Sequence, residues 1–379
     1  MGGARQEAFQ LMRGPRPIGL AAIGVAAVLA LAACGGGGSG SSPSAGYNAG
    51  LTKVVNPSGH KGGTLTFGDS GIPDSTDPGN TYYPFMWNLS RLYTMPLMTY
   101  KSCPGKCGLQ VVPDLATGPG IVSDNGLTWT YHIQADVKFE DGTTVTSPDV
   151  KYAVERTFDR SVLPNGPSYF QVLLGGNAAK YPGPYKDRAK NLMGLTAVTT
   201  PNATTVVFHL ARPFADFNYV VAIPQSAPVP PTKDTGVNYQ LHPMSTGPYK
   251  FQSYQLGKQL TMVPNQFWKA STDPNARQLV SKVVINWNLN ANDIDNQLLA
   301  GDLDLDAAGT SVQAVARAKI LSSATLKASS DDPISGFLWF AYLNTVVTPM
   351  NNPHCRMAVE YAANKSNQQT AYGGPVAGG

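Results

Sequence analysis

The chain has 379 residues and is 42% hydrophobic, so it is long enough to bury the cores of two or three domains. Charged residues make up only 14%, and a formal net charge of +4 is too small to indicate a nucleic-acid-binding surface. Four cysteines in this length exclude a small disulfide-rich scaffold. We therefore expect a folded, loop-rich protein that has no nucleic-acid partner.

The first 33 residues have the pattern of an export signal. Three arginines precede an uninterrupted run of apolar or small residues over 18–33. This length suits a signal peptide better than a membrane-spanning helix, which needs roughly 20 residues. The run ends in Leu-Ala-Ala-Cys34, which resembles the lipobox of bacterial lipoproteins; a plain signal peptide with a chance cysteine is the alternative. We expect residues 1–33 to be a lipoprotein signal peptide, and residues 34–60 to be a lipidated Cys34 followed by a flexible Gly/Ser tether.

Strands and helices alternate along the remaining chain. Leu127, Trp129, Tyr131 and Ile133 alternate with polar residues, which is typical of a half-buried strand. Ser147-Pro148-Asp149 predicts a helix start with Ser147 as the N-cap. In chain order we expect strands at 64–67, 127–133, 205–210, 249–254, 260–263, 283–287 and 337–343, with helices at 147–158, 292–300 and 311–321 and one after Asn352-Pro353.

Cysteines and acids give little indication of metal chemistry. Cys103 and Cys107 lie in a Pro/Gly turn, where a local disulfide is favoured over a redox or zinc pair because no second ligand pair follows. Cys355 is left without a partner. Three aspartates alternate over 302–306, and a solvated strand face is favoured over a calcium site because no glycine-turned loop organises them. We expect no metal and no cofactor.

Four segments carry motifs in a fixed order. The first combines a Gly-Leu-Thr-Trp-Thr strand, a Lys-Phe-x-Asp-Gly-Thr turn and a Tyr-Ala-x-Glu-Arg helix within 123–158. The others are 245–251 followed by Asn265-x-Phe267-Trp268, then 300–304, then Leu343-Asn344 with 356–365. Together they resemble the extracellular solute-binding proteins of family 5, the oligopeptide-, dipeptide- and nickel-binding lipoproteins of ABC transporters. Cys355 before Arg356 departs from the family, which usually has another residue there.

The resemblance implies an α/β, two-lobed periplasmic-binding-protein-like fold with an inserted extra domain. It places lobe I at 61–76 and 191–290, the inserted domain at 77–190 and lobe II at 291–379. Family chains usually continue further, so we expect an incomplete, truncated second lobe; a lobe that closes differently is the alternative.

The same resemblance implies a monomeric, non-enzymatic binding protein, lipid-anchored at the outer face of the cell membrane. It would bind peptides in a cleft between lobes and deliver them to ABC permease subunits. A nickel complex or an oligosaccharide remains open as the solute. Aromatic walls and strand edges suit such a cleft, although most of these aromatics could instead be core. The candidate ligand contacts are Tyr82, Tyr83, Trp87, Thr246, Gly247, Phe337, Trp339 and Tyr342.

Two rival classes remain, a secreted hydrolase and a degenerate surface protein that folds poorly. Gly68-Asp69-Ser70-Gly71 resembles the serine-protease motif, but the match breaks at Ile72. Such an enzyme also needs a histidine and an acid well upstream, and the expected mature chain offers only His60. We expect no catalytic residues.

Overall fold

A computed structural model describes residues 46–187, 193–307, 309, 311–333, 341–371 and 374. Cys34 and the candidate ligand contacts Phe337 and Trp339 lie outside these residues. Within the described ranges, no helix combines the length and apolar character needed to cross a bilayer.

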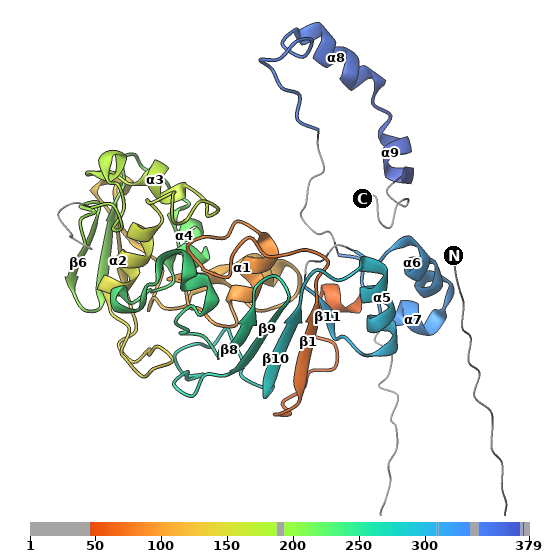
Figure 1. Ribbon diagram of the computed structural model, residues 1–379, viewed down its shortest axis with the longest axis horizontal. Coiled ribbons are helices and arrows are strands. Elements are labelled where there is room, and N and C mark those ends of the chain that lie inside the picture. Colours follow the sequence, from red (N-terminus) through yellow and green to blue (C-terminus); the bar gives the residue numbers. More distant parts are fainter. Residues whose placement is uncertain are drawn as a thin grey trace, which may run out of the picture. The chain divides into compact units, whose positions relative to one another are not determined.

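A five-stranded mixed sheet forms the first layer, in the order β11-β1-β10-β9-β8 (Figure 1). Strand β1 pairs in parallel with both of its neighbours, β11 and β10, whereas β10, β9 and β8 pair antiparallel with one another. Strands were expected at β1, β8, β9 and β10, and β11 falls within 302–306, where the alternating aspartates favoured a strand face. β8 and β9 pair as a hairpin. Their bounds are Thr64–Gly68 (β1), Tyr249–Gln255 (β8), Gln259–Pro264 (β9), Lys282–Asn286 (β10) and Leu305–Asp306 (β11).

One face of this sheet packs on helix α1 (Pro84–Ser90). The alternating residues Val283 and Ile285 of β10 point to this face, together with Leu260 and Met262 of β9. They meet Met86 and Leu89 of α1. Period-2 alternation in the strands therefore produces one buried face, as the sequence predicts.

A second sheet has four antiparallel strands in the order β4-β5-β7-β6. Its aromatic core contains Trp129, Tyr131 and Phe208 from the strands, packed with Phe170 and Phe217 from short helices. A two-stranded ladder, β2-β3, lies before it in the chain. The bounds are Met98–Tyr100 (β2), Val111–Pro113 (β3), Ile121–Ser123 (β4), Thr128–His132 (β5), Val198–Asn202 (β6), Thr205–His209 (β7), Tyr169–Leu173 (α3) and Phe217–Val220 (α4).

The strand pairing of the second sheet crosses the domain boundary that was expected at residue 190. Residues 191–210 were assigned to lobe I, but β6 and β7 pair with β5 of the expected inserted domain. Leu195, Phe217 and Val221 join the same core. Alternation identifies a strand but does not show which sheet it joins, and for this reason the boundary was placed too early.

Helix α2 (Ser147–Arg156) begins one residue earlier than expected, because Thr146 and not Ser147 is its N-cap. The hydroxyl of Thr146 and the side chain of Asp149 form a capping box. Asp149 Oδ2 accepts the Thr146 backbone N–H at 2.7 Å.

The helices that follow the first sheet have the predicted end signals. Helix α5 (Ala291–Ala300) ends at Gly301, whose φ of +83° is the left-handed conformation that favours glycine. Asn352 caps α8 (Pro353–Ala362) through its side chain. The expected strand over 337–343 is not seen in its described part, since Ala341–Leu343 has no regular structure. The other helices are α6 (Ala314–Ser322), α7 (Ala324–Ala328) and α9 (Lys365–Ala371).

Candidate functional site

Residues 74–87, here called the aromatic loop, run from the region after β1 into the first turn of α1. Asp74 organises this loop through both carboxylate oxygens. Oδ1 accepts the Thr81 hydroxyl at 2.5 Å, and Oδ2 accepts the Tyr82 backbone N–H at 2.7 Å. The carboxylate thus closes a turn of eight residues and fixes the backbone that carries the tyrosines.

A buried ion pair holds the same loop from the other side. Arg156, at the end of α2, donates from Nη1 and Nη2 to the two carboxylate oxygens of Asp77, at 3.1 and 2.6 Å. Both side chains are buried. A two-point guanidinium–carboxylate contact fixes orientation as well as distance, so α2 sets the position of the aromatic loop.

The remaining faces of the Arg156 guanidinium are also occupied. Nε donates to Asp234 at 2.9 Å, and the Tyr239 ring lies 4.6 Å from the guanidinium carbon. Burial alone lowers the pKa of Arg156, but the carboxylates of Asp77 and Asp234 more than offset it and raise the pKa well above its ordinary value. The arginine is therefore charged and serves as a structural centre.

The tyrosines of the loop are exposed. Tyr82 is 50% and Tyr83 45% accessible, although their backbone is firmly held. The half-buried Trp87 packs edge-on against Tyr82 at 5.5 Å and donates from Nε1 to the Thr81 carbonyl at 3.0 Å. The structure therefore brings Tyr82 and Trp87 together, whereas the Tyr83 ring lies beside Phe85 at 5.5 Å.

Tyr169 of α3 joins this group, and sequence reasoning missed it. Its hydroxyl lies 3.1 Å from the Tyr82 hydroxyl. This hydrogen bond, with a smaller contribution from burial, raises the pKa of Tyr169 to about 12. The two residues are 87 positions apart, and no local pattern marks Tyr169 as their partner.

Thr246 and Gly247 have a different environment from the one expected. Thr246 is 2% accessible, and its hydroxyl accepts the Met95 N–H at 3.0 Å. The N–H groups of both residues donate to the Tyr93 carbonyl, and a Cβ on Gly247 would lie 2.8 Å from Tyr93 backbone. Both residues pack the start of β8 against residues 93–95, and their expected contact with a ligand stays a prediction.

Tyr342 is 88% accessible in the segment before α8. Ala341 and Leu343 line a hollow of about 490 Å³ together with residues of α8. A second hollow of about 390 Å³ is lined by the β8–β9 turn, the end of β10 and Gln297 of α5. The aromatic loop lines neither of them.

Asp69 follows β1 directly and is fully buried. Its Oδ1 accepts the Gly71 N–H at 2.7 Å, while Oδ2 has no hydrogen-bond partner among the described residues. Burial, reinforced by the nearby Asp306, raises the pKa of Asp69 to about 6 against the opposing Gly71 hydrogen bond. The Gly-Asp-Ser-Gly segment is thus a bend directly after β1 that the Asp69–Gly71 hydrogen bond closes.

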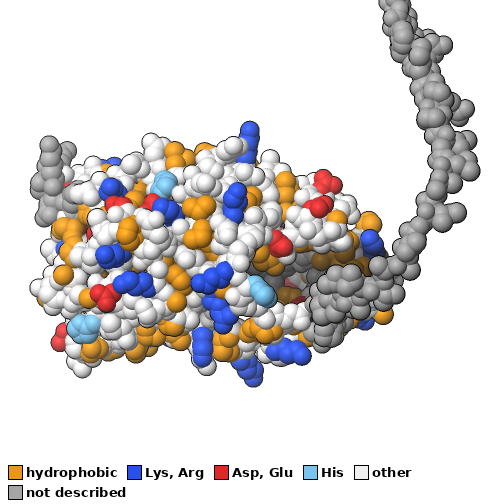
Figure 2. All heavy atoms as spheres, turned by 90° about the horizontal axis from the view of Figure 1, so that it is seen from below, with side chains coloured by type: hydrophobic (Ala, Val, Ile, Leu, Met, Phe, Trp, Pro, Cys, Tyr) orange, Lys and Arg blue, Asp and Glu red, His pale blue; other side chains and the backbone are white. Residues whose placement is uncertain are grey.

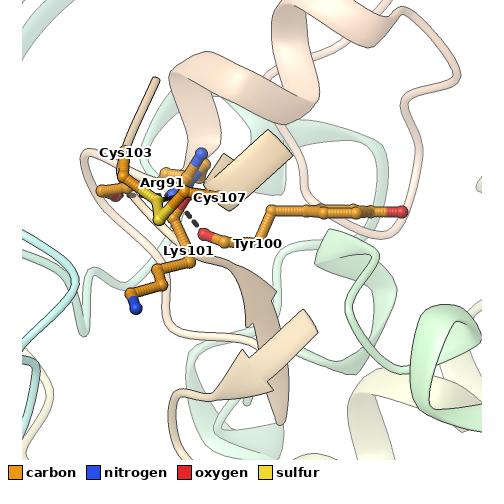
Figure 3. Close-up of a disulfide and its surroundings, with 6 residues drawn as sticks. Arg91, Tyr100, Lys101, Cys103 and Cys107 are labelled. Carbon is orange, nitrogen blue, oxygen red and sulfur yellow. Dashed lines mark hydrogen bonds between the residues drawn. A yellow bond between two sulfur atoms is a disulfide. The ribbon is translucent and has the colours of Figure 1, made fainter. Parts of the chain in front are cut away.

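The structure joins Cys103 and Cys107 by a disulfide with a Cα–Cα distance of 5.7 Å. Figure 3 shows Arg91 directed at the Tyr100 carbonyl beside it, at a distance of 2.7 Å. Cys355 in α8 has a free, half-buried thiol. Among the residues with assigned structure, no group of three or more His, Cys, Asp or Glu side chains could hold a metal ion.

The surface has a mixed charge pattern. On the face drawn in Figure 2, Lys and Arg side chains are spread among hydrophobic and acidic ones. Nucleic-acid sites present a clustered basic patch or stripe instead.

Comparison with known proteins gives consistent matches. The profile described as bacterial extracellular solute-binding proteins, family 5 Middle, matches residues 110–377. The probable D,D-dipeptide-binding periplasmic protein DdpA of Escherichia coli K12 is 26% identical over 305 residues, covering 79% of this chain and 52% of DdpA. The oligopeptide-binding protein OppA of Bacillus subtilis 168 is 26% identical over 258 residues, covering 65% and 43%. The chain spans about half the length of these curated relatives.

Solved structures give the same result. The clavulanic acid biosynthesis oligopeptide binding protein 2 matches with a TM-score of 0.82 and 41% identity, covering 88% of this chain and 60% of that one. The murein tripeptide binding protein MppA of Escherichia coli matches with a TM-score of 0.62 and 20% identity, covering 83% and 58%. At this lower identity the likeness concerns the fold alone.

Proposed function

Because this chain belongs to family 5 of the bacterial extracellular solute-binding proteins, we propose that it captures peptides outside the cytoplasm for an ABC importer. Its fold is the α/β fold of OppA-like periplasmic binding proteins. The similarity to an oligopeptide binding protein at 41% identity supports peptides over a nickel complex or an oligosaccharide.

The observation that carries this proposal is the aromatic loop. Two tyrosines are about half exposed on a backbone that Asp74 and the Arg156–Asp77 pair hold in place. An exposed aromatic ring on a fixed backbone contacts a ligand without a large ordering cost, because few rotatable bonds remain to be fixed. Tyr82, Tyr83 and Trp87, with Tyr169 added, therefore form the proposed wall of the peptide site.

In this proposal, peptide binding shifts the equilibrium between open and closed arrangements of the two lobes. A peptide that contacts two lobes only in their closed arrangement favours that arrangement by its extra contacts. We place the lobe I side at β1, β8, β9 and β10 with the aromatic loop, and the lobe II side at α5 and the residues after it, of which β11 pairs with β1. We extend the inserted domain to include β6 and β7, and their pairing with β5 supports this division.

The finer parts of the proposal come from the sequence. Cys34 carries the lipid, and the Gly/Ser-rich residues that follow it separate the folded body from the outer face of the membrane. The protein works as a monomer and its macromolecular partner is the permease of the importer. No bond is made or broken in the solute.

A fluorescence titration with a mixture of tri- to pentapeptides tests the wall directly. We expect Tyr82→Ala to weaken binding by about tenfold to a hundredfold, as removal of a buried aromatic contact does. Tyr219→Ala is the matched control, because Tyr219 is 48% accessible and lies in α4. Equal peptide affinity of the two variants would show that the aromatic loop is not part of the peptide site.

A further inference from the structure

The first described residues of the chain are held by a distant loop. We call Tyr47–Leu51 the strap and Lys327–Asp332 the strap-facing loop. The Asn48 N–H donates to the Ser330 carbonyl at 3.0 Å, and Asn48 Oδ1 accepts the Asp332 N–H at 2.7 Å. The Lys327 ammonium lies 5.1 Å from the centre of the Tyr47 ring. These contacts join residues about 280 positions apart.

Gly50 makes the closest approach of the strap to this loop. Its N–H donates to Asp331 Oδ1 at 2.9 Å, and a Cβ at this position would lie 2.3 Å from Asp331 Oδ2. Glycine therefore allows the carboxylate to reach the backbone N–H. Gly59, further along the same segment, has nothing within 4 Å of such a Cβ.

The other end of the strap touches the disulfide loop, Lys101–Gln110. A Cβ on Gly105 would lie 2.9 Å from the Leu51 carbonyl oxygen, and Gly105 has a φ of +65°. The Cys103–Cys107 disulfide and the hydrogen bond from the Lys101 N–H to the Gln110 carbonyl, at 2.9 Å, hold this loop in shape. The strap therefore contacts two segments that are far apart in sequence.

We propose that the strap-facing loop and the disulfide loop together form a docking surface for the chain's own residues 47–51, and that the strap couples the two loops. In terms of the proposed function, on which this consequence rests, the strap joins lobe II to the inserted domain, and docking of the strap favours one arrangement of these two parts.

Coupling has a measurable signature. If the strap binds both loops at once, weakening its contact with one loop must also weaken its contact with the other. Amide hydrogen exchange at Asn48 and Gly50 reports the contact with the strap-facing loop, because Asn48 and Gly50 donate to Ser330 and Asp331. This measurement needs neither lipid nor peptide.

The experiment compares four variants of the full chain. We expect Asp331→Ala and Gly50→Ala to speed exchange at the strap amides by about tenfold, since each removes or blocks a hydrogen bond of the strap. We expect Gly105→Ala to speed exchange at the same amides by about threefold or more, although residue 105 has no contact with the strap-facing loop in the described structure. Gly59→Ala should leave the exchange unchanged.

Two results would overturn the proposal. Strap amides that exchange at unprotected rates in the unmodified chain would show that the strap does not dock. Protection that survives Gly105→Ala, with the disulfide intact by mass spectrometry and the Lys101 amide still protected, would show that docking does not couple the loops. Exchange at the strap amides and its response to Gly105→Ala can be measured whether or not the protein binds a peptide. A failure of the proposed function is therefore distinguishable from a failure of this inference.

Discussion

Arg156 and Asp77 form a two-point ion pair across 79 positions of sequence, and both side chains are buried. The pair connects the last residue of α2 to the loop that presents Tyr82 and Tyr83. One electrostatic contact therefore links the packing of the second sheet to the geometry of the proposed ligand wall.

Replacing Arg156 tests this link. Arg156→Met leaves the carboxylates of Asp77 and Asp234 buried without their cation, so we expect a loss of about 3–5 kcal/mol in the free energy of unfolding. Urea denaturation measures this loss. The exposed Arg212→Met is the control and should change stability by less than about 0.5 kcal/mol. A small loss in Arg156→Met would mean that the pair does not hold the loop.

Glu155, the residue before Arg156, predicts a pH dependence of stability. Its side chain is fully buried, and burial raises its pKa from 4.5 to about 8 despite a hydrogen bond from the Leu195 N–H at 2.8 Å. The folded protein therefore holds this proton more tightly than the unfolded chain. The stability linked to the protonated carboxyl is complete below about pH 4.5 and is lost as the pH rises to about 8.

Glu155→Gln keeps the hydrogen-bond acceptor and removes the charge. We expect this variant to have the same melting temperature as the parent near pH 4 and a higher one at pH 8.5. Each unit of pKa difference corresponds to about 1.4 kcal/mol. Thermal unfolding across this pH range measures the effect. If the melting temperatures of the two proteins changed with pH in parallel, the raised pKa of Glu155 would be contradicted.

Gly142 marks a contact between two of the sequence motifs. It lies in the Lys138–Thr143 turn with a φ of +88°, and a Cβ there would lie 3.0 Å from the ring of Phe267. Gly142→Ala should cost about 1–3 kcal/mol, because alanine meets both backbone strain and the ring. Gly63→Ala, at a φ of +76° with nothing within 4 Å, is the matched control in the same denaturation experiment, because it shares the backbone strain and lacks the ring contact. Equal stability of both variants would contradict the contact.

Local patterns predicted the elements better than their partners. Alternation located β5, whose Trp129 and Tyr131 are buried, and Gly301 and Asn352 marked helix ends through their own backbone and side-chain chemistry. These signals depend on neighbouring residues only. The family motifs then gave the fold and the class of protein.

Long-range contacts could not be predicted in the same way. Which sheet β6 and β7 join, and which acid Arg156 meets, depend on residues far away in sequence. Helix α3 has only five residues, too few for a periodic signal, so Tyr169 was missed. The hydrogen bonds that join Thr246 to Tyr93 and Met95 cross about 150 positions of sequence, so its motif did not reveal them.

Native mass spectrometry of the protein purified from its own host tests the central claim most directly. The account predicts a fraction of the protein carrying a non-covalent peptide, which is released intact on mild denaturation and rebinds when added back. A protein that carries no peptide from its host and binds none from a mixed peptide pool, or one that converts added peptides into fragments, would contradict it.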